Sequence, residues 1–279
     1  MKREDLKILA AETLSIVENG CYKYRNKNVD ISQLLLSSAK NSVYYSQDKV
    51  DSIIEQFRPA QRFAETKFLV FPESTVKSAL ILEKKQLDTS EKIGILNFAS
   101  ARHAGGGFIN GAMAQEESLA FSSNLYQCQT MSQCEEYYEA NRNFNSCLYT
   151  DGMIFSPDTV FFRDENYMLK PVPSLFSVLT CPAVNKGAVE RNEKDKIFIT
   201  DVVMEKRMSK ILGMFAYLRY ETIILGAYGC GVFKNSPATI AEIWSKLLHE
   251  KYNGMFRTVC FAVLDRNKKN IAPFYEYFS

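Results

Sequence analysis

Histidine, paired cysteines and long apolar runs are scarce or missing in this sequence of 279 residues. With only His103 and His249, the chain cannot build a histidine-rich metal site. The seven cysteines are odd in number and scattered, without a C-x-x-C spacing, which argues against a disulfide framework and a thiolate metal site. We therefore expect reduced thiols in a cytoplasmic protein that uses no metal and no other cofactor.

The sequence also lacks a membrane-spanning stretch and a strong net charge. No run reaches the roughly 18 apolar residues that a membrane span needs, and the N-terminus mixes charges into its apolar residues, unlike a signal peptide. Lys plus Arg number 34 and Asp plus Glu number 32, so the net charge is +2. This balance excludes the broad basic field of nonspecific nucleic-acid binding, and any anionic ligand has to be held by local geometry.

The spacing of apolar residues predicts an α/β protein. Helical intervals over residues 6–17 predict an amphipathic helix that stops at Asn19-Gly20. Residues 183–196 are polar and are expected to form a surface loop. Buried or alternating runs predict strands at 67–71, 93–99, 152–155, 159–162, 175–180, 222–225 and 258–264. Helices are predicted over 75–85, 114–126, 208–218 and 240–248. Alternating strands and helices favour a sandwich with a largely parallel or mixed sheet.

Two glycine-rich segments follow predicted strands. The first, residues 97–119, contains Gly105, Gly106 and Gly107 and then a helix that opens with two carboxylates. The second, residues 225–235, reads LGAYGCGVFKN. Consecutive glycines let backbone N–H groups converge on one anion, so two such loops could grip a diphosphate. Glycines that only make tight turns remain the alternative for either loop alone.

Glu116 and Glu117 fall in the first turn of a predicted helix. Carboxylates there favour the helix dipole, so a purely structural role is one interpretation. A Gln-Glu-Glu triplet beside a phosphate-binding loop favours a second one, because a carboxyl group near a bound diphosphate should have a raised pKa and suit general acid catalysis. A thiol nucleophile at Cys230 with His103 as its base is another possible arrangement. The sequence shows no third group that would orient the histidine, which argues against it.

The run GGG, seven residues and QEE resembles the signature of poly(ADP-ribose) glycohydrolases. The segments NFASARHAGGGF and AQEESLAFSS resemble the microbial-type branch of that family, as do GAYGCGVFKNSP and SPDTVFFRD. The resemblance implies a macrodomain-like three-layer α/β/α sandwich with a mixed sheet. We expect residues 1–60 to form an N-terminal helical extension packed on the core, and residues 61–279 to form the catalytic domain.

Carried over by position, the resemblance implies a metal-independent hydrolase that cleaves ribose–ribose O-glycosidic bonds from the chain end and releases ADP-ribose. It gives Glu117 the acid–base role and Glu116 the task of holding the ribose hydroxyls. The ligand-binding residues that it implies are Asn97, Gly105, Gly106, Gly107, Gln115, Gly229, Cys230, Gly231, Val232 and Phe233.

The sequence departs from the family's pattern at three positions. Ala104 stands where a Pro usually precedes the glycines, Phe121 where an Arg usually follows QEE, and Tyr228 where a Trp is common. Two other functions stay open: a hydrolase acting on a single ADP-ribose attached to protein or nucleic acid, and a noncatalytic ADP-ribose-binding module. Neither a membrane nor a sequence-specific nucleic acid is expected as a partner, and the chain is expected to be a monomer.

Overall fold

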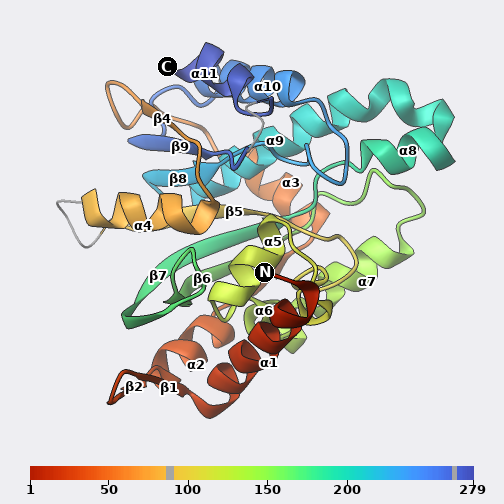
Figure 1. The fold of residues 1–279 in the computed structure, drawn as a ribbon. Coiled ribbons are helices and arrows are strands. Elements are labelled where there is room, and N and C mark those ends of the chain that lie inside the picture. The colour runs from red at the N-terminus through yellow and green to blue at the C-terminus, as the bar shows by residue number, and fades with distance from the viewer. Residues whose placement is uncertain (86–90, 266–268) are drawn as a thin grey trace.

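The fold alternates helices and strands along most of the chain (Figure 1). The computed structural model describes residues 1–85, 91–265 and 269–279. The strands are β1 (Cys21–Tyr24), β2 (Lys27–Asp30), β3 (Val43–Tyr45), β4 (Lys67–Phe71), β5 (Ile93–Phe98), β6 (Met153–Arg163), β7 (Leu169–Cys181), β8 (Thr222–Leu225) and β9 (Thr258–Ala262). The helices are α1 (Arg3–Asn19), α2 (Ser32–Lys40), α3 (Gln47–Gln56), α4 (Thr75–Lys85), α5 (Gln115–Ser122), α6 (Leu125–Gln129), α7 (Glu135–Asn143), α8 (Lys186–Asn192), α9 (Thr200–Tyr217), α10 (Pro237–His249) and α11 (Ala272–Phe278).

Seven strands form the central sheet, in the order β3-β6-β7-β5-β8-β9-β4. The five strands from β7 to β4 run parallel to one another, whereas β6 pairs antiparallel with β7 and β3 antiparallel with β6. The sheet is therefore mixed, as the sequence predicts. The strands β1 and β2 form a separate hairpin.

Successive residues of the central strands enter different cores because side chains alternate across a sheet. Leu96 packs with α3, α9, α10 and α11 on one face, and its neighbour Ile95 packs with α4, α5 and α6 on the other. Ile223 and Ile224 of β8 divide in the same way. The three-layer α/β/α sandwich is therefore confirmed.

The first 60 residues are joined closely to the rest of the molecule. Helix α1 is capped at its C-terminus by Gly20, whose φ of +69° lies in the left-handed region, and its Leu9 shares a buried cluster with Phe121. Strand β3 is the edge of the central sheet. Whether residues 1–60 form a unit separate from 61–279 stays a prediction, and the structure adds that this segment supplies a strand as well as helices.

Four predicted elements are divided, joined or replaced in the structure. The helix expected over 114–126 is broken into α5 and α6, because the amide group of Asn124 accepts the N–H of Val160 at 2.8 Å. The strands expected at 152–155 and 159–162 are one strand, β6, with a bulge. The loop expected over 183–196 contains α8, which begins where the side chain of Asn185 accepts the N–H of Ala188.

Candidate active site

A cavity of about 1360 Å³ lies at the carboxyl ends of the parallel strands. Ligands bind at this edge in open α/β sheets, because loops and helix N-termini converge there. Each of the five parallel strands sends residues into the cavity wall where it ends or directly after it. In sheet order these are Ala183 after β7, Phe98 of β5, Ala227 after β8, Ala262 of β9 and Glu73 after β4.

Glu116 lies in the first turn of α5 and is only 3% exposed. Its Oε1 accepts hydrogen bonds from the side-chain amides of Asn97 and Gln129, each at 3.1 Å, and its Oε2 accepts the N–H of Ser100 at 2.7 Å. Burial raises the pKa of Glu116 to about 7, although these three donors lower it. The negative charge of Glu117 raises this pKa further. Both oxygens of Glu116 are therefore held by the protein.

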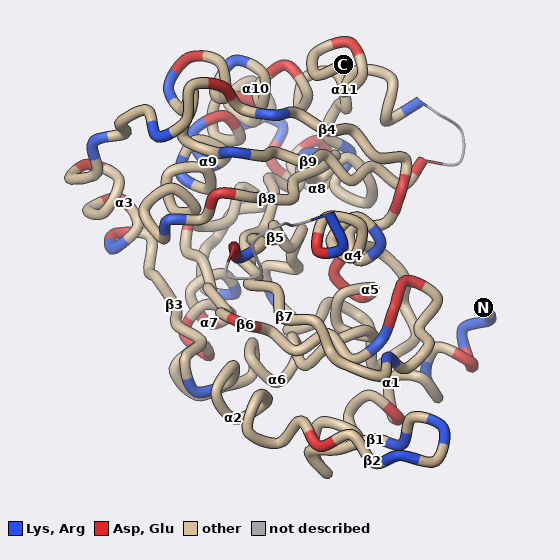
Figure 2. Tube along the Cα trace, turned by 90° about the vertical axis from the view of Figure 1, so that its left-hand side faces the viewer, with Lys and Arg blue, Asp and Glu red and all other residues tan. Residues whose placement is uncertain are grey.

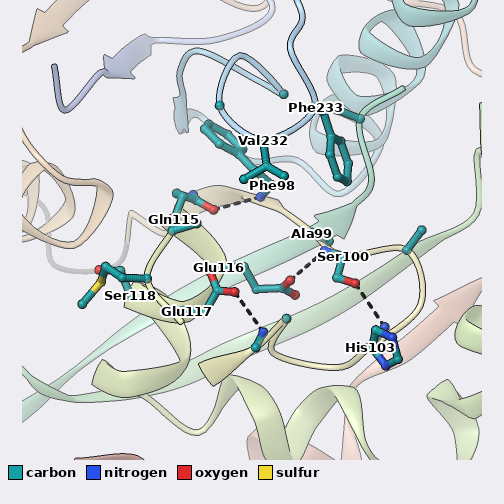
Figure 3. A pocket seen from close by; sticks show the side chains of 18 of the residues that line it. Phe98, Ala99, Ser100, His103, Gln115, Glu116, Glu117, Ser118, Val232 and Phe233 are labelled. Carbon is teal, nitrogen blue, oxygen red and sulfur yellow. Dashed lines mark hydrogen bonds between the residues drawn. The ribbon is translucent and has the colours of Figure 1, made fainter. Parts of the chain in front are cut away.

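Glu117 differs from its neighbour in having an uncommitted oxygen. Its Oε1 accepts the N–H of Gly107 at 2.9 Å, whereas its Oε2 accepts no hydrogen bond from the part of the chain that the structure describes. Both glutamates line the cavity and lie below Val232 and Phe233 in Figure 3. Glu117 can therefore contact a ligand through Oε2 without breaking a bond to the protein.

The glycine run packs directly against the two carboxylates. Gly105 and Gly106 have φ values of +60° and +59°. A Cβ on Gly106 would lie 2.5 Å from Oε1 of Glu117 and 3.1 Å from Oε2 of Glu116. A side chain at Gly106 would therefore collide with the acidic pair, so this position requires glycine.

The N–H groups of this run already have partners. That of Gly105 donates to Gln129, that of Gly106 to the carbonyl of His103, and that of Gly107 to Glu117. The expectation that all three glycines contact a diphosphate stays a prediction, and in this structure their N–H groups donate to protein acceptors. Here the run orders the acidic pair and the buried glutamine beside it.

The second glycine loop, between β8 and α10, offers free donors instead. Gly229 has a φ of +72°, and the segment from Gly229 to Phe233 lines the cavity. Within the described residues, the N–H groups of Gly229, Gly231, Val232 and Phe233 donate to no protein acceptor. Successive free N–H groups form a concave anion site. This loop therefore offers the free donors that were expected of both loops.

Phe233 and Cys230 complete this second loop. The ring of Phe233 lies 6.1 Å from that of Tyr149, so two aromatic rings stand at the same end of the loop. Burial raises the pKa of the Cys230 thiol to about 12, which leaves it protonated at neutral pH. A thiolate nucleophile at Cys230 is therefore unsupported.

Two predicted ligand-binding side chains are committed to the protein. The side chain of Asn97 is fully buried and is not part of the cavity wall; its Nδ2 donates to Glu116 and to Thr180, whereas its Oδ1 accepts no hydrogen bond from the described residues. The amide of Gln115 bonds to the backbone of Phe98 and Leu96 at the end of β5. In this structure both position the start of α5.

Sequence reasoning missed Gln129, which is fully buried at the end of α6. It links Gly105 to Glu116 and also donates to Thr180 at 3.3 Å. A single buried glutamine gives no pattern in the sequence that could reveal it. Ser100 was missed as well, because it acts through its backbone N–H.

Two of the departures from the family's pattern lie outside the cavity wall. Phe121 is buried against Leu9 of α1, and Tyr228 is buried with its hydroxyl donating to the carbonyl of Cys181 at 3.0 Å. Ala104, in contrast, lines the cavity. Among the described residues, no group of three or more His, Cys, Asp or Glu side chains could hold a metal ion. Nor is any described helix sufficiently long and apolar to cross a membrane.

The fold and the site define a class: a macrodomain-like α/β/α protein that carries a carboxylate pair in its ligand cavity. Comparison with protein families is more specific, since the microbial-type PARG catalytic domain matches residues 10–164. The chain belongs to this family of poly(ADP-ribose) glycohydrolases. A search of curated proteins gave no match.

Solved structures of bacterial poly(ADP-ribose) glycohydrolases resemble this one over nearly the whole chain. One from Thermomonospora curvata has a TM-score of 0.89 and 33% identity, and the match covers 99% of this chain and 98% of that one. The same enzyme bound to the inhibitor ADP-HPD has a TM-score of 0.87 and 32% identity, with 98% and 99% covered. A Deinococcus radiodurans enzyme in complex with ADP-ribose has a TM-score of 0.84 and 34% identity, with 90% and 99% covered.

Proposed function

We propose that the chain hydrolyses the ribose–ribose O-glycosidic bond of poly(ADP-ribose) at the free end and releases ADP-ribose. The observation that carries the catalytic assignment is the difference between the two glutamates. Both oxygens of Glu116 accept hydrogen bonds from the protein, whereas Oε2 of Glu117 is uncommitted. Glu117 is therefore the acid–base residue. Glu116 would hold the ribose hydroxyls through Oε2, which accepts only the N–H of Ser100 and can accept a second hydrogen bond.

The order of strands orients the substrate. The acidic pair stands at the end of β5, the loop with free N–H groups follows β8, and Leu264 and Glu73 line the cavity beyond β9 and β4. ADP-ribose has its ribose, diphosphate and adenosine in the same linear order. The terminal unit would therefore lie with its ribose at Glu117, its diphosphate on Gly229–Phe233, and its adenosine above β9 and β4.

Glu117 would act twice in the reaction. In its protonated form it gives its proton to the departing 2′-oxygen as the bond to the ribose C1″ breaks and an oxocarbenium-like ribose forms. As a carboxylate it then removes a proton from the water that attacks the same carbon. Glu116 and the substrate phosphates would stabilise the positive charge.

The direct test is to incubate the protein with purified poly(ADP-ribose) and to follow the products through the first few per cent of reaction. ADP-ribose as the early product supports hydrolysis from the chain end, whereas early short oligomers would contradict it. Cleavage of mono-ADP-ribosylated protein with no cleavage of polymer would favour the mono-ADP-ribosyl hydrolase. Binding of ADP-ribose with neither cleavage would favour a noncatalytic module. The cytoplasmic location and the monomeric state remain predictions.

A further inference from the structure

The cavity continues past the acidic pair on the β7 side of the sheet. Its wall there contains Tyr138 and Arg142 of α7, together with Arg102 and His103 from the segment between β5 and the glycine run. His103 and Ser118 lie on opposite sides of the two glutamates (Figure 3). Pockets for one small molecule usually measure about 300–1,000 Å³. The volume of about 1360 Å³ leaves room for more than the terminal unit.

The positive charge of the cavity is concentrated at this end. Of the lysines and arginines in the described chain, only Arg102 and Arg142 line the cavity. Neither forms an ion pair with a described residue, and both are exposed. Arg142 donates one N–H to the backbone carbonyl of Arg102 at 3.2 Å, so its guanidinium group lies against the Arg102 backbone. Most of the donors of the two guanidinium groups therefore remain free.

Negative side chains share this end, so net charge alone would not attract an anion. Glu135 and Glu139 of α7 also line the cavity. Lys, Arg, Asp and Glu are interspersed along the whole chain (Figure 2). An anionic group would therefore be held here by direct contact with the arginines and not by a broad field. Guanidinium groups suit this task because their planar fork bonds phosphate in a bidentate manner.

We propose that Arg102 and Arg142 form a subsite for the diphosphate of the penultimate ADP-ribose unit, the unit that leaves with the shortened polymer. The inference rests on the proposed function. With the terminal ribose at β5 and its diphosphate at β8, the 2′-oxygen of the leaving group points to the β7 side. That oxygen belongs to an adenosine, and the diphosphate joined to the same adenosine is the first charged group of the leaving chain.

The test separates polymer binding from ADP-ribose binding. In the Glu117→Gln background, which removes turnover, affinities for purified poly(ADP-ribose) and for free ADP-ribose are measured with Arg102→Gln, Arg142→Gln and both together. The double variant should bind polymer about tenfold or more weakly, because charge-assisted hydrogen bonds are lost, and its binding should depend less on salt. ADP-ribose affinity should change less than about twofold. Arg142→Lys, which keeps the positive charge, should lose less polymer affinity than Arg142→Gln.

Arg25→Gln is the matched control. It makes the same change on the β1–β2 hairpin, outside the cavity wall, and should leave both affinities unchanged. Unchanged polymer binding in the double variant would overturn the subsite. An equal loss of polymer and ADP-ribose affinity would also overturn it, since the arginines would then contact the terminal unit. Failure of the proposed function is a separate result, namely the absence of ADP-ribose release by the wild-type chain.

Discussion

Glu116 and Glu117 are neighbours with the same functional group, and their surroundings make them chemically different. Glu116 is enclosed by Asn97, Gln129 and the backbone of Ser100, whereas Glu117 is tied through one oxygen to Gly107. Two carboxyl groups with distinct environments can serve distinct roles in one reaction. The structure thus supports a fixed glutamate that positions the ribose and a second one that exchanges protons.

The raised pKa of Glu116 predicts a pH-dependent stability. Its pKa of about 7 in the folded state exceeds the ordinary value of 4.5, so the folded protein binds more protons than the unfolded chain between these pH values. The free energy of unfolding should therefore fall as the pH rises through this range, by up to about 1.4 kcal/mol per pH unit from this group. In denaturant titrations from pH 4 to 8, the unfolding free energy of Glu116→Gln should fall less steeply with pH than that of the wild type. An unchanged slope in the variant would contradict the assignment.

The glycine run makes a sharper prediction at the scale of a loop. Gly106→Ala forces a left-handed residue with a Cβ that meets Glu117, so it should lower the free energy of unfolding by about 1–2 kcal/mol from the backbone alone and should abolish catalysis. Gly231→Ala is the matched control for stability, because a Cβ at this position would have no atom within 4 Å and the φ of Gly231 is not positive. Its unfolding free energy should change by less than about 0.5 kcal/mol. Equal costs at the two positions would contradict the steric argument.

The spacing of apolar residues predicts helices and strands well where burial of one face fixes the element. It predicts them less well where tertiary contacts decide where an element begins or ends. The buried strand at 93–98 and the helix after Arg3 match their predictions because apolar spacing fixes them. The break between α5 and α6 depends on Asn124 pairing with Val160, a residue 36 positions away. Helix α8 depends on a cap and on burial of Val189. Tertiary contacts of this kind leave no local signal, whereas the cap of α8 joins Asn185 to Ala188 and is a local feature that the sequence does contain.

The candidate site shows the same division. The motif around Gly106 and Glu117 locates the cavity from the sequence alone. The sequence does not reveal that the N–H groups of the glycine run already donate to protein acceptors. Nor does it reveal that the side-chain amides of Gln129 and Asn97 donate to Glu116. These roles follow from how three separate elements meet. Motifs therefore locate the chemistry here, and only the fold assigns each donor to its acceptor.

At the scale of the whole molecule, α1 supports the site without entering it. Its Leu9 packs against Phe108, which directly follows the glycine run, and its Arg3 donates to the carbonyl of Asn110. Leu9→Ala should lower the free energy of unfolding by about 2–4 kcal/mol and reduce activity as the loop loosens. Ile8→Ala on the same helix is the control, since Ile8 is 61% exposed against 6% for Leu9, and should cost less than about 0.5 kcal/mol. Both variants are measured by thermal and by denaturant unfolding. Equal losses of unfolding free energy in Leu9→Ala and Ile8→Ala would contradict this role of α1.

The acid–base role of Glu117 is tested by comparing the wild-type chain with Glu117→Gln for release of ADP-ribose from purified poly(ADP-ribose), alongside calorimetric binding of free ADP-ribose. We expect release by the wild type, a loss of at least about 100-fold in the variant because general acid–base catalysis is removed, and similar ADP-ribose affinity for both. A variant that keeps its activity, or a wild-type chain that binds ADP-ribose and leaves the polymer intact, would contradict it.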